Sequence, residues 1–304
     1  MTFTERWCEK ARAKGAPVCV GLDPVLEKLP PALFEGTADL GRAAAADAIE
    51  RFCLGVIDAV ADVVPCVKPQ LACFERYGSA GLAAYERVAS AAKDAGLLVI
   101  ADAKRGDIGI SAEHYAAAFF EGEYAADALT VSPYLGPDTL EPFMDAAQRN
   151  QGAVFVLVRT SNPGSGVWQG LETADASRVV DHVGDFVEQQ SDARRGALMF
   201  GPVGAVVGAT HPREAAALRQ RMPHVLFLVP GFGAQGGGAE DVRACFHARG
   251  HARVAEAGTG AIITASRSVI YAPPSPGQSW QDAVRHAAWG LRDQVAGAVQ
   301  ASDS

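Results

Sequence analysis

Short apolar runs alternate with longer amphipathic segments along this 304-residue chain, and no other feature constrains the fold as strongly. Each run suits a buried strand, and the segments between them carry apolar residues at helical spacing. Alternating strands and helices form a parallel sheet, and eight strands close a (β/α)8 barrel. We therefore predict an α/β protein with a (β/α)8 TIM barrel, with an open doubly wound sheet as the alternative. The runs lie at residues 18–20, 66–69, 97–102, 128–131, 153–158, 205–207, 226–229 and 261–264.

Nothing in the sequence divides the chain into parts. No Ser-, Gly- and Pro-rich linker separates two halves, so we expect a single domain over residues 1–304. Residues 280–299 have helical spacing and follow the last apolar run. They are expected to form a closing helix that packs against the barrel.

Charge and composition narrow the possible partners. The formal net charge of −8 does not favour nucleic acid or an anionic membrane surface, although an anionic small-molecule substrate remains compatible with it. The first residues are charged and lack the apolar core of a signal peptide, and no stretch approaches the roughly 20 apolar residues of a membrane span. We expect a cytoplasmic protein whose six cysteines are mostly buried thiols.

Opposite charges gather where two neighbouring apolar runs end. Asp102 ends the third run and Lys104 follows two residues later, and residues i and i+2 of a strand share one face. Lys68 lies in the second run, which is expected beside the third, and Asp107 follows in the next loop or first helical turn. In a barrel the carboxyl ends of the strands carry the chemistry. We therefore predict an alternating array of Lys68, Asp102, Lys104 and Asp107 at that end.

This array favours chemistry over stability. Buried ion pairs are weak stabilisers, whereas oppositely charged neighbours keep all four groups ionised near neutral pH. The array holds no nucleophilic Ser or Cys beside a base. A fixed ammonium group can stabilise a developing carbanion and then protonate it, and a fixed carboxylate would repel a substrate carboxylate. The residues thus indicate acid chemistry on an anion, such as decarboxylation.

Glycine-rich sequence follows the seventh run, at residues 230–238, and Ser266-Arg267-Ser268 follows the eighth. These two loops form the usual phosphate site of a barrel, where backbone N–H groups and a bidentate Arg hold the anion. Gly231, Gly233 and Gly236 also match the G-x-G-x-x-G pattern of dinucleotide-binding proteins. The sequence disfavours that interpretation, because Glu256, the acidic residue at a suitable distance, lies in a polar, Gly-containing segment and not at a strand end. A phosphate-bearing ligand is therefore expected, with backbone N–H groups of the glycines and the Arg267 side chain among its contacts.

These motifs together resemble the orotidine 5'-phosphate decarboxylase family over nearly the whole barrel. The D-x-K-x-x-D core at Asp102, Lys104 and Asp107 is the family's most specific signature, and Lys68 matches the lysine after its second strand. The Pro-Gly-x-Gly-x-Gln-Gly run from residue 230 and the later Ser266-Arg267-Ser268 also fit the family, and the extra length and the segment 131–136 resemble its longer bacterial subgroup. The resemblance implies conversion of orotidine 5'-phosphate to uridine 5'-phosphate in pyrimidine biosynthesis, with no metal and no cofactor.

The resemblance also implies a role for each residue of the array. Lys104 would protonate C6 of the pyrimidine after carbon dioxide leaves, while Asp102 would face the substrate carboxylate. Lys68 would bridge Asp102 and the ribose. Asp107, accompanied by Ser111, would reach into the neighbouring subunit's site, so the active unit would be a homodimer.

The remaining implied contacts surround the nucleotide. Asp23 would bind the ribose hydroxyls, and Ser161 would read the pyrimidine edge. Gly233, Gln235 and Arg267 would hold the phosphate. The loop at 159–171 and the glycine-rich run would close over the ligand as lids.

Two other interpretations remain open at this point. A related barrel decarboxylase or aldolase acting on a sugar phosphate shares D-x-K-x-x-D, but it carries a metal-binding acid where this chain has Lys68. A non-catalytic barrel that binds a phosphate ligand would not require Lys104 next to Asp102.

Overall fold

The computed structural model describes residues 1–33, 41–122, 124, 126–233, 238–247 and 260–301. These residues form parallel strands that close into a barrel, in which each strand pairs with the next in sequence and β8 returns to pair with β1. The predicted closed barrel is confirmed, and the open doubly wound sheet is wrong. The strands are β1 (Val18–Leu22), β2 (Cys66–Pro69), β3 (Leu98–Arg105), β4 (Ala128–Val131), β5 (Ala153–Arg159), β6 (Val203–Val207), β7 (Phe227–Val229) and β8 (Ala261–Ala265).

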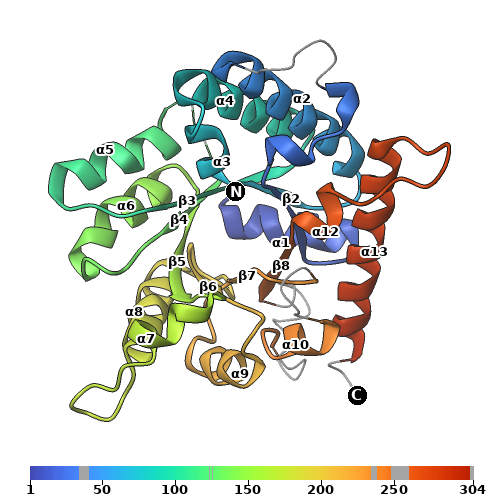
Figure 1. Ribbon diagram of the computed structural model, residues 1–304. Helices are drawn as coiled ribbons and strands as arrows, with labels where there is room; N and C mark the ends of the chain where they lie inside the picture. The colour runs from blue at the N-terminus through green and yellow to red at the C-terminus, as the bar shows by residue number, and fades with distance from the viewer. Residues whose placement is uncertain (34–40, 123, 125, 234–237, 248–259, 302–304) are drawn as a thin grey trace.

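Helices surround the barrel as a ring (Figure 1). Single 3-10 turns occur at η1 (Leu26–Lys28), η2 (Pro31–Leu33), η3 (Pro137–Leu140) and η4 (Pro163–Ser165). The helices are α1 (Phe3–Lys14), α2 (Arg42–Val60), α3 (Leu71–Glu75), α4 (Gly78–Asp94), α5 (Gly109–Phe120), α6 (Glu141–Arg149), α7 (Gly166–Gln169), α8 (Val179–Arg194), α9 (Pro212–Arg221), α10 (Ala239–Arg243), α12 (Arg267–Ile270) and α13 (Trp280–Ala301).

Strand side chains alternate between two cores. Along β1, Val18, Val20 and Leu22 join the outer core between the barrel and the helices, whereas Cys19 points to the barrel interior with Cys66 of β2. Because both faces of the sheet are covered, the strands read as continuous apolar runs rather than as alternating ones. The outer core accounts for the amphipathic spacing of the helices, and α13, which was expected as a closing helix, packs against α2, α10 and α12.

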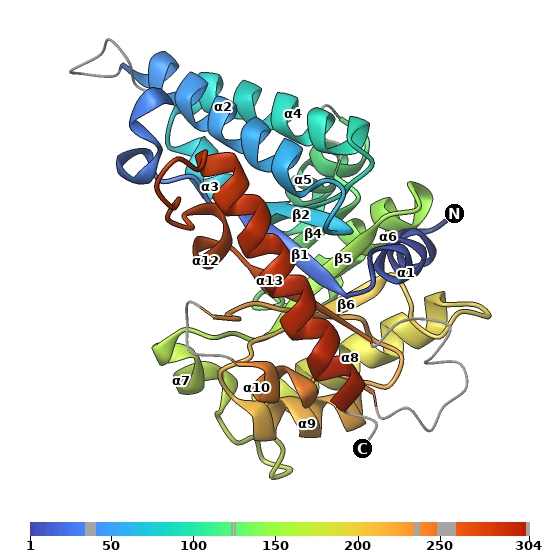
Figure 2. The ribbon, with the colours of Figure 1, turned by 90° about the vertical axis from the view of Figure 1, so that its right-hand side faces the viewer.

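The first helix closes the N-terminal end of the barrel, and the sequence analysis did not anticipate it. Thr2 and Glu5 form a capping box, which begins α1. Phe3, Trp7 and Ala11 follow at helical spacing, all buried, and the Phe3 ring meets Phe155 of β5 edge to face at 5.9 Å. Figure 2 shows α1 at one end of the barrel, with α3, α7 and α12 towards the other. The mouth that α1 leaves open is the end where the predicted charges lie.

Within the described part of the chain, no helix has both the length and the apolar character needed to cross a membrane.

Helix α1, which closes the N-terminal end of the barrel, is called the α1 plug below. Truncation of its Phe3 side chain should destabilise the fold without changing the residues at the mouth. Phe3→Ala is expected to lower the free energy of unfolding by about 3–5 kcal/mol, because it leaves a cavity beside Phe155. Urea unfolding followed by circular dichroism measures this loss. Phe3→Leu is the matched control, since it keeps most of the apolar volume and should lose clearly less. Equal stability of the alanine variant and the unchanged protein would contradict the assigned role of α1.

Candidate active site

The ends of β2 and β3 place the predicted charges inside the mouth of the barrel. Side chains alternate along β3: Asp102 and Lys104 point inward, whereas Ala103 packs against the outer core. Arg105 also points outward, where it pairs with Glu75 of α3. The i, i+2 spacing therefore brings the two charges to one face, as expected from strand geometry.

The Asp102 carboxylate accepts hydrogen bonds from four described side chains. On Oδ2, Lys68 Nζ donates at 2.6 Å and Gln70 Nε2 at 3.1 Å. On Oδ1, Lys104 Nζ donates at 2.5 Å and Thr130 Oγ1 at 3.2 Å. The two neutral donors, Gln70 and Thr130, were not predicted from the sequence. The available signals were the position of Gln70, two residues after Lys68, and a single hydroxyl in the otherwise apolar run of β4.

The two lysines keep Asp102 ionised in a buried place. Burial by itself would raise the pKa of Asp102, but the ammonium groups of Lys68 and Lys104 outweigh it and hold that pKa well below its usual range. Burial would likewise lower the pKa of Lys68, and the carboxylates of Asp102 and Asp23 raise it above its ordinary value. The site therefore holds one negative charge between two positive ones near neutral pH.

Lys104 reaches this position through an unusual backbone. The register of the β3–β4 ladder shifts between Ala101 and Arg105. Within the shift Lys104 has a φ of 48°, a left-handed conformation that costs a non-glycine residue about 1–3 kcal/mol. Its backbone N–H donates to Thr130 Oγ1 at 2.9 Å. Such strain persists only where surrounding contacts hold it, and it is concentrated in functional sites.

A cavity of about 90 Å³ opens beside Lys68, and Asp23, Ser266 and Arg267 line it. Asp23 Oδ1 and Ser266 Oγ are both buried without a hydrogen-bond partner among the described residues. Buried polar atoms are normally paired, so these two are available to a polar ligand. Gly21 makes room here, because a Cβ on it would lie 2.7 Å from the Ser266 side chain.

The predicted phosphate end lies next to this cavity. Gly231 and Gly233 follow β7 with φ values of 101° and 76°, which suit glycine. Arg267 begins α12, and its side chain is exposed at the mouth. Gln235, predicted to contact the phosphate, lies outside the described residues.

Asp107 and Ser111 do not join the cluster within one chain. The Asp107 carboxylate accepts the backbone N–H of Ile108 at 2.8 Å and makes no ion pair among the described residues. Ser111 lies in the first turn of α5, beside Ile110. The alternating array expected from the sequence thus has three members in a single chain, and Asp107 stands apart from Lys104.

Arg159, the last residue of β5, anchors the loop that carries Ser161. Its buried guanidinium pairs with Glu214 of α9 at 2.5 Å and donates to Ser165 Oγ at 2.5 Å and Gln169 Oε1 at 3.2 Å. Burial would raise the pKa of Glu214, but Arg159 brings it below its ordinary value. The loop is therefore tied to the barrel through its own first residue, which the sequence analysis had assigned to the loop alone.

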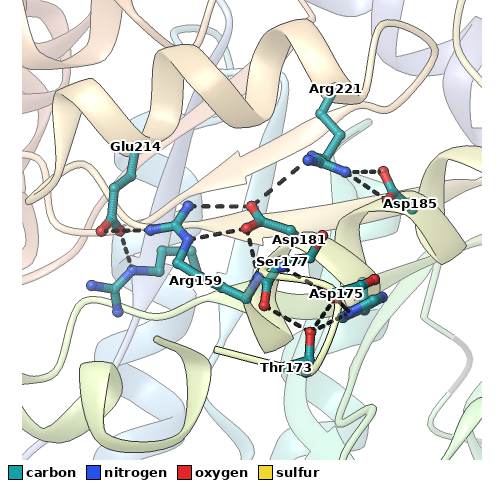
Figure 3. Close-up of polar contacts among 10 residues, drawn as sticks. Arg159, Thr173, Asp175, Ser177, Asp181, Asp185, Glu214 and Arg221 are labelled. Carbon is teal, nitrogen blue, oxygen red and sulfur yellow. Dashed lines mark hydrogen bonds and ion pairs between the residues drawn. The ribbon is translucent and has the colours of Figure 1, made fainter. Parts of the chain in front are cut away.

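The ion pairs continue from Glu214 across α8 and α9 (Figure 3). Arg178 Nη1 lies 3.3 Å from Glu214, and its Nε lies 3.0 Å from Asp181. Arg221 then lies 3.9 Å from Asp181 and 2.6 Å from Asp185. This network holds both ends of the β5–α8 loop, and Ser161 lies next to Gly208 after β6.

The mouth of the barrel thus holds ammonium and carboxylate groups beside a glycine-rich loop and an arginine. This arrangement is typical of barrel enzymes that act on anionic, phosphate-bearing substrates. The comparisons with known proteins specify the class further. A family model described as "Orotidine 5'-phosphate decarboxylase / HUMPS family" matches residues 16–283.

Relatives match over almost their whole length. An orotidine 5'-phosphate decarboxylase of Rhodopirellula baltica is 44% identical over 98% of this chain and 100% of its own. That of Deinococcus radiodurans is 41% identical over 98% of each chain. The structure of Leishmania donovani OMP decarboxylase matches with a TM-score of 0.74 and 32% identity, over 98% of each chain. The chain therefore belongs to the orotidine 5'-phosphate decarboxylase / HUMPS family, and the expected family, enzyme class and fold are confirmed.

Neutralising Asp102 should cost stability in a pH-dependent way. Asp102→Asn leaves the Lys68 ammonium buried without its anion, so we expect a loss of about 3–5 kcal/mol at pH 7. The folded-state pKa of Asp102 lies below its unfolded value of about 3.9, so its contribution is present above that pH and is lost as the pH falls further. Urea unfolding at pH 7 and near pH 3 measures the difference.

Asp185→Asn is the matched control, because it removes a carboxylate from the exposed end of the network in Figure 3. Its effect on the free energy of unfolding should be much smaller. A loss for Asp102→Asn that equals the control, or that is unchanged near pH 3, would contradict the electrostatic account of the cluster.

Proposed function

We propose that this protein decarboxylates orotidine 5'-phosphate to uridine 5'-phosphate in de novo pyrimidine biosynthesis, without metal or cofactor. The observation that carries the proposal is the placement of Lys68 and Lys104 on the two oxygens of one buried carboxylate, at 2.6 and 2.5 Å. Family membership supports the substrate. The fixed charges support the reaction, because decarboxylation leaves an electron pair that needs a nearby cation.

The cluster would act on both stages of the reaction. With C6 of the pyrimidine beside Lys104, the bond from C6 to the carboxylate breaks, carbon dioxide leaves and the electron pair remains on C6. The Lys104 ammonium then transfers a proton to C6, and solvent restores that proton to the amine. Because the ammonium is in place before the reaction, it stabilises the developing charge without reorganisation.

Asp102 would contribute in the ground state. Two like charges about 4 Å apart repel by roughly 4 kcal/mol at an effective dielectric near 20. A substrate carboxylate next to Asp102 would feel this repulsion, and loss of carbon dioxide would relieve it. Lys68, on the neighbouring strand, keeps Asp102 charged during this step, because its ammonium group lowers the pKa of Asp102.

Other predicted site residues suit the rest of the nucleotide. Asp23 would accept hydrogen bonds from the ribose hydroxyls, and Ser161 would read the pyrimidine edge from the β5 loop. Gly233, Gln235 and Arg267 would bind the phosphate. Binding energy from the phosphate would then be used to position the base, which lies away from these contacts.

A homodimer would complete the array. Apolar side chains adjacent to Asp107 and Ser111 in the sequence are exposed: Ile108 is 63% exposed and Ile110 69%. Large apolar side chains left in solvent in this way are typical of a protein–protein interface. Asp107 would cross this interface and lie beside Lys104 in the neighbouring subunit.

Lys68 argues against the metal-dependent sugar-phosphate alternative. Where that group of barrels carries a metal-binding acid, this chain places an ammonium 2.6 Å from the Asp102 carboxylate. A divalent cation at this position would meet a positive charge. A barrel that only binds phosphate would gain nothing from the strained Lys104 backbone.

The direct test is release of carbon dioxide and loss of orotidine 5'-phosphate absorbance on incubation with the purified protein. Turnover should be unchanged by EDTA, because no metal takes part. Lys104→Ala should abolish turnover and still bind uridine 5'-phosphate. Loss of activity on chelation would favour the metal-dependent alternative, and near-normal turnover of Lys104→Ala would remove the proposed mechanism.

Mixed dimers test the shared site. Lys104→Ala and Asp107→Asn should each be inactive alone, because each lacks one member of the array. On mixing and subunit exchange, half of the dimers should be mixed and hold one intact site, which restores about a quarter of normal activity. Activity of the mixture no higher than that of the separate variants would show that Asp107 does not act across an interface.

A further inference from the structure

The hydroxyl group of Thr130 contacts two of the charged residues of β3, Asp102 and Lys104. Thr130 is on β4 and is only 1% exposed. Its Oγ1 accepts the backbone N–H of Lys104 at 2.9 Å and lies 3.2 Å from Asp102 Oδ1. The carbonyl of Ala101 is a more distant acceptor, at 3.5 Å. One hydroxyl thus contacts both the main chain of the lysine and the carboxylate that the lysine binds.

The hydrogen-bond chemistry of a hydroxyl fixes its direction here. A threonine hydroxyl has one proton to donate and can accept at its lone pairs. The charged and nearer Asp102 oxygen is the better acceptor than the Ala101 carbonyl. Thr130 therefore accepts from Lys104 and donates to Asp102.

The register shift between β3 and β4 explains why the backbone N–H of Lys104 donates to a side chain. Through the shift, the pairing passes from Ala101 with Leu129 to Arg105 with Val131, and the residues between are out of the regular ladder. The Lys104 N–H donates to the Thr130 side chain instead. The hydrogen bond from the Lys104 amide to Thr130 thus holds the left-handed backbone of Lys104 in place.

Thr130 also contacts the carboxylate that binds the ammonium group of Lys104. Lys104 Nζ and Thr130 Oγ1 both donate to Oδ1 of Asp102, at 2.5 and 3.2 Å. Thr130 therefore restrains the backbone from which the lysine side chain starts and the oxygen on which its ammonium ends. Valine has nearly the shape of threonine and would fill the space in this apolar strand, so the hydroxyl is what distinguishes the residue.

We propose that Thr130 is a positioning residue that holds the Lys104 ammonium where C6 of the pyrimidine is protonated. The inference rests on the proposed decarboxylation. Misplacement of a reacting group by about 1 Å can cost on the order of 100-fold in rate, so a single hydroxyl can be decisive without touching the substrate.

The test compares Thr130→Val, Thr130→Ser and Thr4→Val. Thr4 is the matched control: it is also buried, and its hydroxyl donates to the Gly201 carbonyl at 3.2 Å, at the far end of the barrel. Steady-state kinetics with orotidine 5'-phosphate give kcat and KM, and calorimetry gives the Kd of uridine 5'-phosphate. We expect Thr130→Val to lower kcat about 100-fold, with KM and Kd changed less than about threefold.

Thr130→Ser keeps the hydroxyl and should regain most of the lost kcat, and Thr4→Val should turn over like the unchanged protein. The proposal is overturned by a kcat of Thr130→Val within twofold of normal, or by equal losses in Thr130→Val and Thr4→Val. A valine variant that no longer binds uridine 5'-phosphate while Thr4→Val does would also overturn it, because Thr130 would then maintain the fold. An unchanged protein that releases no carbon dioxide would refute the decarboxylation itself.

Discussion

One carboxylate held between two ammonium groups is the interaction on which the site depends. Asp102 alone would be expensive to keep charged in a buried position, and Lys68 alone would tend to lose its proton there. Each makes the charged form of the other the stable one, and the pKa shifts of both have this sign. The arrangement contributes little to the stability of the fold. Its main effect is an electrostatic field at the open end of the barrel, where two positive groups face one negative group.

Closure of the barrel sets the geometry of this interaction. Lys68 and Asp102 come from adjacent strands, and the ladder between β2 and β3 determines how far apart their side chains start. The neutral donors are Gln70, directly after β2, and Thr130 of β4, so residues of three neighbouring strands and one residue that follows β2 converge on one carboxylate. A parallel sheet with a different strand order would separate these groups, which connects the fold directly to the chemistry.

The barrel could be predicted from the sequence, because the spacing of apolar residues follows which faces of the strands and helices are buried. Every predicted apolar run overlaps a strand, and segments with helical spacing between the runs form helices. Helix α8 begins only at Val179, because Glu172 and Arg178 first pair in a short antiparallel bridge. Such a turn leaves little trace in hydrophobic spacing.

The site was less accessible to the same reasoning. Spacing identified the charged residues, since i and i+2 on a strand share a face. It did not identify Thr130 or the ion pair between Arg159 and Glu214, which are 55 residues apart in sequence. Contacts of this kind depend on how helices and strands meet in three dimensions, and a single sequence carries no periodic signal for them.

The α1 plug has a consequence for the order of assembly. The helix precedes its partners by a long stretch of chain: Phe3 donates its backbone N–H to Gln151, and Thr4 donates to Gly201. Its apolar face can be covered only after these partners have been synthesised, so sealing of this end is a late, long-range step in folding.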